Sequence, residues 1–120
     1  MDDCIFCKMI RGEINCAKVY ENEDVLVFLD INPKAPGHTL VIPKNHYENI
    51  YDIQENDLME ITKVVKMMSG RIKERLNPDG IYIRQNSGEL AGQSVFHFHI
   101  HIVPCYEKQP EGNIQEILTD

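Results

Sequence analysis

Long apolar runs are missing from this 120-residue chain. The apolar stretches are only a few residues long, whereas a membrane-spanning helix needs about 20. The first residues, Met1-Asp2-Asp3-Cys4, are acidic, and a secretory signal would begin with a basic segment. The sequence therefore predicts a cytoplasmic protein with neither a membrane span nor an export signal.

Basic clusters are also missing. Lysine and arginine number 12 against 19 aspartates and glutamates, for a net charge of -7. Broad nucleic-acid binding needs a basic stripe for phosphate contacts, so this class of function is excluded. A small anion remains compatible with the charge, because a few backbone N–H groups and histidines in one pocket can hold it.

Low-complexity tracts and internal repeats are absent too, and the composition is that of a globular protein, with 42% hydrophobic and 26% charged residues. The length predicts one domain over residues 1–120. Apolar periodicity and turn residues predict a short helix, five strands and one long helix, which we place in chain order at 4–11, 18–21, 25–29, 38–42, 55–76, 81–85 and 97–103. Short connections between successive strands favour an antiparallel α+β fold.

Three of the five histidines alternate with apolar residues in the last predicted strand. Side chains on a strand alternate between faces, so His97, His99 and His101 are expected on one face with Phe98 behind them. This pattern leaves three interpretations open: a polar face, a metal site with three histidine ligands, or a site with a nucleophilic histidine. The preceding Gly92-Gln93-Ser94 would place an amide and a hydroxyl near a bound phosphate.

The cysteines suggest a second site. In a chain without export signals, the pair Cys4-x-x-Cys7 indicates metal ligands or a redox pair, and the absence of a βαβ pattern argues against the redox pair. A closed zinc site needs two more ligands, for which His38, His46 and the three alternating histidines are available. We expect the other cysteines, Cys16 and Cys105, to be ordinary buried thiols.

The stretch Gly92–Val103 resembles the signature of the histidine triad (HIT) superfamily. Residues 5–10, 28–38 and 40–44 also resemble that family, in the right order, so that the resemblance covers about residues 4–106 and leaves a variable tail at 107–120. Within the superfamily the chain looks most like the Hint-like branch and its zinc-containing bacterial relatives. This resemblance implies a homodimer with a continuous ten-stranded sheet, acting as a phosphoramidase or nucleotidyl hydrolase on purine nucleotide conjugates such as AMP-amines or dinucleoside polyphosphates.

The resemblance also implies roles for individual residues. His99 matches the family nucleophile that forms a nucleotidyl-histidine, and His101 and Ser94 match catalytic groups at the phosphate and leaving group. A structural, non-catalytic zinc ion would be held by Cys4, Cys7, His46 and His97, with His38 as a neighbour of the histidine cluster. The remaining matches are substrate contacts: Asp30 to the ribose hydroxyls, Asn86 to the phosphate or ribose, Gln93 to the phosphate and leaving group, and Ile5, Phe6, Phe28, Leu29 and Ile31 to the base.

Two other functions remain open on the sequence. One is a zinc hydrolase in which all three alternating histidines bind the metal. The other is a nucleotide-binding regulatory or scaffold protein whose hydrolysis is incidental.

Overall fold

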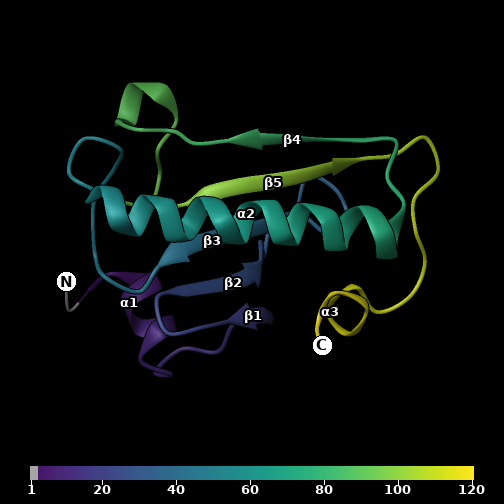
Figure 1. Cartoon of the computed structure of the whole chain (residues 1–120), viewed down its shortest axis with the longest axis horizontal. Helices are drawn as coiled ribbons and strands as arrows, with labels where there is room; N and C mark the ends of the chain where they lie inside the picture. The colour runs from purple at the N-terminus through teal and green to yellow at the C-terminus, as the bar shows by residue number, and fades with distance from the viewer. Residues whose placement is uncertain (1–2) are drawn as a thin grey trace.

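A five-stranded antiparallel sheet with the strand order β1-β2-β3-β5-β4 forms the centre of the computed structural model (Figure 1). The structure describes residues 3–120, so Met1 and Asp2 of the predicted domain lie outside the described residues. The elements are α1 (Ile5–Ile10), β1 (Lys18–Glu21), β2 (Val25–Leu29), β3 (Thr39–Pro43), α2 (Glu55–Leu76), β4 (Gly80–Arg84), the 3₁₀ turn η1 (Glu89–Ala91), β5 (Ile100–Cys105) and α3 (Ile114–Leu118). The predicted α+β class is therefore confirmed.

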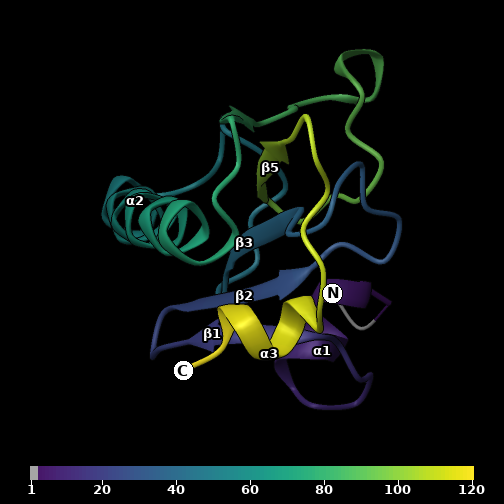
Figure 2. The ribbon, with the colours of Figure 1, turned by 90° about the vertical axis from the view of Figure 1, so that its right-hand side faces the viewer.

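Helix α2 covers one face of the sheet (Figure 2). Its apolar residues recur at helical intervals, so that Ile61, Met68 and Ile72 lie on one stripe and are fully buried. They pack against residues of β2 and β3 such as Val27 and Val41. The helix ends at Asn77, which has a left-handed backbone and donates its N–H to the carbonyl of Lys73.

Helix α1 covers part of the opposite face. Alternation along β2 and β3 turns a second set of apolar residues away from α2, and Phe6 of α1 packs against this set, which comprises Leu26, Phe28, Leu40 and Ile42. The central strands are therefore buried on both faces. This second apolar layer lies beside the histidines, because the ring of Phe6 makes edge contacts with His97 and His99 at centroid distances of 5.8 and 5.3 Å.

The histidine strand is displaced from its predicted range of 97–103: β5 spans Ile100–Cys105, so it begins three residues later and ends two residues later than predicted. Strand β5 begins at Ile100, so His97 and His99 precede it in irregular backbone. The ladder with β3 stops at the pair Val41–Ile100. Pro43 at the end of β3 has no N–H to continue it, and the N–H of Phe98 instead bonds the carbonyl of Tyr47 at 2.7 Å.

The alternation of side chains is nevertheless preserved across this irregular stretch. Phe98 is fully buried in the core beneath α2, whereas His97 and His99 face Phe6 on the other side.

Other differences from the sequence predictions are small, apart from the tail. Helix α1 is one residue shorter at each end than the predicted 4–11, and β3 and β4 are each displaced by one residue. The tail contains a helix that we did not predict, α3, whose Leu118 is fully buried in the core formed with α2. The cysteine prediction was wrong in detail, since Cys105 is exposed and Cys16 is only partly buried. None of the helices within residues 3–120 is both long and apolar enough to cross a membrane.

Candidate functional site

Two cysteines and two histidines from distant parts of the chain converge at the amino end of α1. Cys4 and Cys7 belong to this helix and its N-cap, His46 follows β3, and His97 precedes β5. The ligand atoms of the four residues lie within 4.8 Å of one another. Individual contacts are 3.4 Å from Cys4 Sγ to His97 Nδ1, 3.5 Å from Cys7 Sγ to the same nitrogen, and 3.3 Å from Cys7 Sγ to His46 Nδ1.

These distances fit a tetrahedral zinc ion. Typical Zn–S and Zn–N bond lengths give a sulfur-to-nitrogen edge of about 3.6 Å in a regular tetrahedron. The Nε2–H of His97 donates to the carbonyl of Pro43 at 2.8 Å, so the lone pair of Nδ1 faces the two sulfurs. Burial and the neighbouring Cys4 raise the pKa of the Cys7 thiol to about 11, an environment that only a bound cation would make favourable for a thiolate. The predicted set Cys4, Cys7, His46 and His97 is therefore assembled by the fold.

His99 lies beside this cluster and is oriented by the backbone. Its Nδ1–H donates to the carbonyl of His97 at 2.7 Å, so Nε2 carries the lone pair of the neutral ring. The side chain is buried, and this burial lowers the pKa of His99 below its usual value. A neutral imidazole with one available nitrogen is the form that a histidine nucleophile requires.

His101 belongs to a separate chain of hydrogen bonds. The backbone N–H of Lys34 donates to Nδ1 of His38 at 3.0 Å, and Nε2 of His38 lies 2.9 Å from Nδ1 of His101. The proton between the two rings therefore belongs to His38, because its other nitrogen already accepts. Asp30 adds a carboxylate 3.5 Å from the same Nε2. Burial and the neighbouring His99 and Arg84 lower the pKa of His101 to about 4, and burial also lowers the pKa of His38, so both rings are neutral near pH 7.

The three alternating histidines do not converge on one point. Within residues 3–120, the groups that could hold a metal are Cys4-Cys7-His46-His97 and Asp30-His38-His101, and neither includes His99. The 2.9 Å separation of the His38 and His101 nitrogens is shorter than the roughly 3.3 Å edge expected between two nitrogens on a tetrahedral zinc ion. That contact is a hydrogen bond. The geometry thus does not favour the three-histidine metal site.

An apolar cavity of about 220 Å³ opens between α1, β2 and the histidines. Its walls include four of the five residues predicted to contact the base, together with Asp30, Ser94, His99 and His101. Leu29 does not line it, because alternation along β2 turns this side chain toward the α2 core. Met9, Asn32, Leu40 and Val95 line the cavity without having been predicted. Met9 could have been found from the sequence, since it lies four residues after Ile5 on the same helix face.

The three polar residues near the histidines have different surroundings. Ser94 lines the cavity. Gln93 is buried and its amide is fully engaged: Oε1 accepts from Gly88 N–H at 2.8 Å, and Nε2 donates to the carbonyls of Glu48 and Val95. Asn86 donates to the carbonyl of Ala91 at 2.6 Å. In this structure Gln93 and Asn86 hold the loop before the histidines, and Ser94 is the one of the three that lines the cavity.

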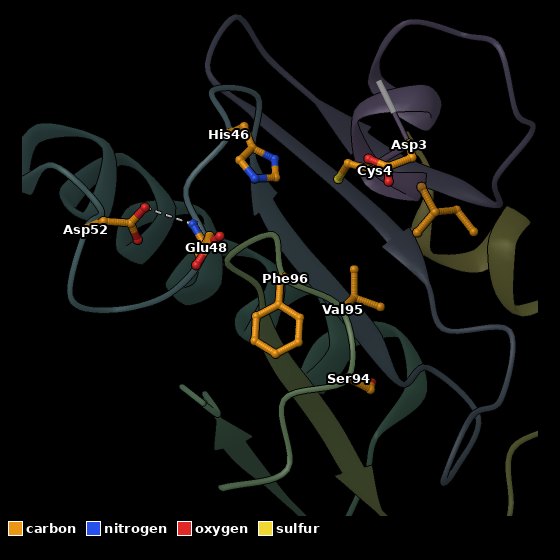
Figure 3. Close-up of a pocket in the computed structure, with 9 residues that line it drawn as sticks. Asp3, Cys4, His46, Glu48, Asp52, Ser94, Val95 and Phe96 are labelled. Atoms are coloured by element: carbon orange, nitrogen blue, oxygen red, sulfur yellow. Dashed lines mark hydrogen bonds between the residues drawn. The ribbon is translucent and has the colours of Figure 1, made fainter. Parts of the chain in front are cut away.

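A larger hollow of about 630 Å³ adjoins the cysteine–histidine cluster and shares Ile5, Ser94 and Val95 with the cavity. Figure 3 shows His46 and Cys4 on one side of it and Phe96 on another. The carboxylate of Asp52 accepts the backbone N–H groups of Glu48 and Asn49, which lowers the pKa of Asp52 and closes the loop at this wall.

Comparison with known proteins decides the family. Residues 11–108, more than three quarters of the chain, match the HIT domain. The chain belongs to the HIT domain family. It is 49% identical to Protein hit of Bacillus subtilis over 107 residues, covering 89% of this chain and 74% of that protein. A HIT family protein from Bacillus anthracis superposes with a TM-score of 0.86 at 49% identity, covering 93% of this chain and 80% of that one.

Three further HIT relatives are named for a bound metal or for an enzymatic activity. A Zn-bound histidine triad family protein from Mycobacterium smegmatis superposes with a TM-score of 0.87 at 33% identity, over 97% and 88% of the two chains. The adenosine 5'-monophosphoramidase of Schizosaccharomyces pombe is 39% identical over 84% of this chain and 73% of that protein. The adenylylsulfatase of Arabidopsis thaliana is 40% identical over 89% of this chain but only 54% of that protein. The homologues therefore include Hint-like proteins, and the names phosphoramidase and adenylylsulfatase support a nucleotide hydrolase activity.

Proposed function

We propose that this HIT protein hydrolyses purine nucleotide conjugates at the α-phosphorus through a nucleotidyl-histidine intermediate on His99. The observation that carries the proposal is the hydrogen bond from Nδ1 of His99 to the His97 carbonyl, which directs the lone pair of the ring to Nε2 beside the cavity. The named phosphoramidase and adenylylsulfatase among the relatives support the same class of reaction.

The proposed reaction has two steps. In the first step, Nε2 of His99 attacks phosphorus, a P–Nε2 bond forms, and the bond from phosphorus to the leaving group breaks, with an amine leaving group taking a proton from solvent water. In the second step, water attacks the same phosphorus, the P–Nε2 bond breaks, the proton of the attacking water returns to solvent, and the mononucleotide leaves. Ser94 and His101 line the cavity beside His99, where their donors would stabilise the phosphoryl oxygens.

The nucleoside would occupy the apolar cavity. Phe6 and Phe28 provide aromatic walls at a centroid distance of 5.3 Å, and Ile5 and Ile31 complete the predicted base contacts. Asp30 lies at the edge of the same cavity. Its Oδ1 accepts the N–H of Asn32 at 2.9 Å, so the carboxylate is held in one orientation for the ribose hydroxyls.

Zinc would have a structural role here. Four protein ligands, Cys4, Cys7, His46 and His97, would close a tetrahedral site and leave no position for a reactive water. Bound zinc would supply a rigid connection between α1 and the backbone just before His99. That backbone carries the His97 carbonyl which orients the nucleophile.

The whole of residues 1–120 would act as one HIT domain in a homodimer. Strand β4 lies at the edge of the sheet, and its Tyr82 and Ile83 are 42% and 53% exposed, respectively, which suits pairing with β4 of a second copy into a ten-stranded sheet. An Ile83→Lys variant should then have about half the molar mass of the wild-type protein in solution, as measured by light scattering. A wild-type protein that is itself monomeric at micromolar concentration would overturn the dimer.

The test of the chemistry is to trap the intermediate. We expect a nucleotidyl adduct on the peptide containing His99 by mass spectrometry after a rapid quench with adenosine phosphoramidate, followed by release of AMP. His99→Asn should lose at least about a thousandfold in kcat, as other enzymes do without their nucleophile. Thr62→Ala serves as the control, since Thr62 is exposed on α2 and bonds only its own helix at Leu58. Near wild-type turnover in His99→Asn would refute the covalent mechanism. If the wild-type protein binds nucleotide but does not turn it over, the regulatory or scaffold function is favoured.

A further inference from the structure

Arg84 is a charged residue next to the histidines that none of the roles above uses. It ends β4, where its Cα is directly paired with that of His101 on β5. Directly paired residues of neighbouring strands project from the same face of a sheet, so Arg84 shares the face of His101. Its Nη2 lies 3.4 Å from Nε2 of His101.

This contact joins two donors. Because His38 supplies the proton of its hydrogen bond with Nδ1 of His101, the hydrogen of a neutral His101 ring is on Nε2. An arginine side chain has no acceptor either, so neither nitrogen can satisfy the other. Two N–H groups that converge without an acceptor between them are the arrangement that binds an anionic oxygen.

The other end of the Arg84 guanidinium, at Nε, lies inside the protein. Nε of Arg84 is buried and has no hydrogen-bond partner within residues 3–120. The described residues also include no carboxylate in an ion pair with Arg84, although the positive charge is close enough to lower the pKa values of His38, His99 and His101. A partly buried cation without a counter-ion is costly, and an anionic ligand removes that cost.

The order of the strands gives the direction in which such a ligand would extend. The apolar cavity and Asp30 are on the β2 and β3 side of the histidines, and β4 is on the other side, as Figure 1 shows from β2 to β4. A nucleotide with its nucleoside in the cavity and its phosphorus at His99 therefore extends its leaving group over β5 toward Arg84.

We propose that Arg84 and His101 form the leaving-group subsite and select conjugates in which the leaving group is an oxyanion joined by an anhydride bond, such as a phosphate or a sulfate. This inference rests on the proposed nucleotidyl transfer at His99. Arg84 is then a specificity-determining residue: its guanidinium pairs with negative charge that an anhydride leaving group has and that an amine leaving group lacks.

The test compares substrates that share AMP and differ in the leaving group. We would measure kcat/KM for diadenosine tetraphosphate, adenylyl sulfate and adenosine phosphoramidate with wild-type protein, Arg84→Met and Arg84→Lys. We expect Arg84→Met to lower the ratio of anhydride to phosphoramidate efficiency about 10- to 100-fold, the cost of one charge-assisted hydrogen bond, and Arg84→Lys to recover part of it. Loss with only one of the two anhydrides would identify phosphate or sulfate as the preferred group.

The control is Lys34→Met. Lys34 is an exposed cation whose charge also reaches His38, but it lies on the Asp30 side of the cluster. The Lys34→Met substitution should change kcat/KM for all three substrates by one common factor. If Arg84→Met also lowers them by a common factor, or raises the anhydride ratio, the inference is overturned.

A binding measurement separates this inference from the proposed function. By calorimetry, wild-type protein should bind ADP at least about tenfold more tightly than AMP, because the β-phosphate reaches Arg84, and Arg84→Met should bring the two affinities together. A wild-type protein that hydrolyses none of the substrates refutes the proposed reaction, yet the ADP preference still tests Arg84. Equal affinities for AMP and ADP in the wild-type protein overturn the subsite.

Discussion

Removal of one thiolate from the cysteine–histidine cluster should release zinc and lower stability together. Cys4 is the N-cap of a six-residue helix, and a helix of that length is not stable by itself. Zinc would connect this helix to His46 and His97, residues far away in the sequence. We therefore expect Cys4→Ser to contain less than one tenth of the zinc of the wild-type protein.

The size of the stability change follows from linkage. A ligand present at 100 times its dissociation constant stabilises the folded state by about 2.7 kcal/mol. For 120 residues, the typical unfolding entropy near 60 °C amounts to about 0.25 kcal/mol per degree. Loss of the zinc should therefore lower Tm by about 10 °C.

The assay combines metal analysis with thermal unfolding followed by circular dichroism, with and without a chelator. The chelator should lower Tm of the wild-type protein by about 10 °C and leave that of Cys4→Ser nearly unchanged. Cys16→Ser is the matched control, because Cys16 is also partly buried but lies outside the cluster. Wild-type zinc content in Cys4→Ser, or loss of zinc from His99→Asn, would refute this assignment of the ligands.

Three other perturbations test separate parts of the structure. Asp30→Asn should weaken AMP binding about tenfold but that of 2',3'-dideoxy-AMP far less, by calorimetry, because only AMP presents ribose hydroxyls; equal losses would disprove the ribose contact. Phe98→Ala should lower the free energy of unfolding in urea by about 3–5 kcal/mol, since Phe98 is fully buried. Phe96 is 43% exposed, so Phe96→Ala should lower this free energy by less than about 1 kcal/mol; similar losses in both variants would contradict the packing. The pKa of His101 is about 4 in the folded protein and 6.5 for an unperturbed histidine, so the unfolded chain binds more protons between those values and stability falls as pH is lowered from 6.5 toward 4. His101, with His38, His99, Asp30 and Arg84 around it, should account for about 2 kcal/mol of the loss between pH 7 and pH 5, which His101→Asn would remove; an unchanged pH dependence in that variant would refute the shift.

Much of the fold is predictable from local patterns in the sequence. The apolar spacing from Glu55 to Leu76 predicts α2 with its bounds, and β1 and β2 also occur where the β-branched residues place them. The start of β5 is not predictable in this way, because the ladder stops where Pro43 of another strand fails to donate. Helix α3 was missed for a similar reason: its five residues are too few for a clear helical period, and their packing on α2 stabilises them.

The sequence alone determined the chemistry available to this protein: an alternating histidine run, a cysteine pair at helical spacing, a Gly-Gln-Ser segment and an acidic residue before a proline-rich loop. The tertiary structure decided how these groups are used. It separates His97, which faces the cysteines, from His99 and His101, which line the cavity, and it leaves the Gln93 amide within its own loop. It also brings Arg84 of β4 against His101 of β5. Such pairings depend on strand register and on the side chains that take each hydrogen bond, which are set by contacts between residues far apart in the chain.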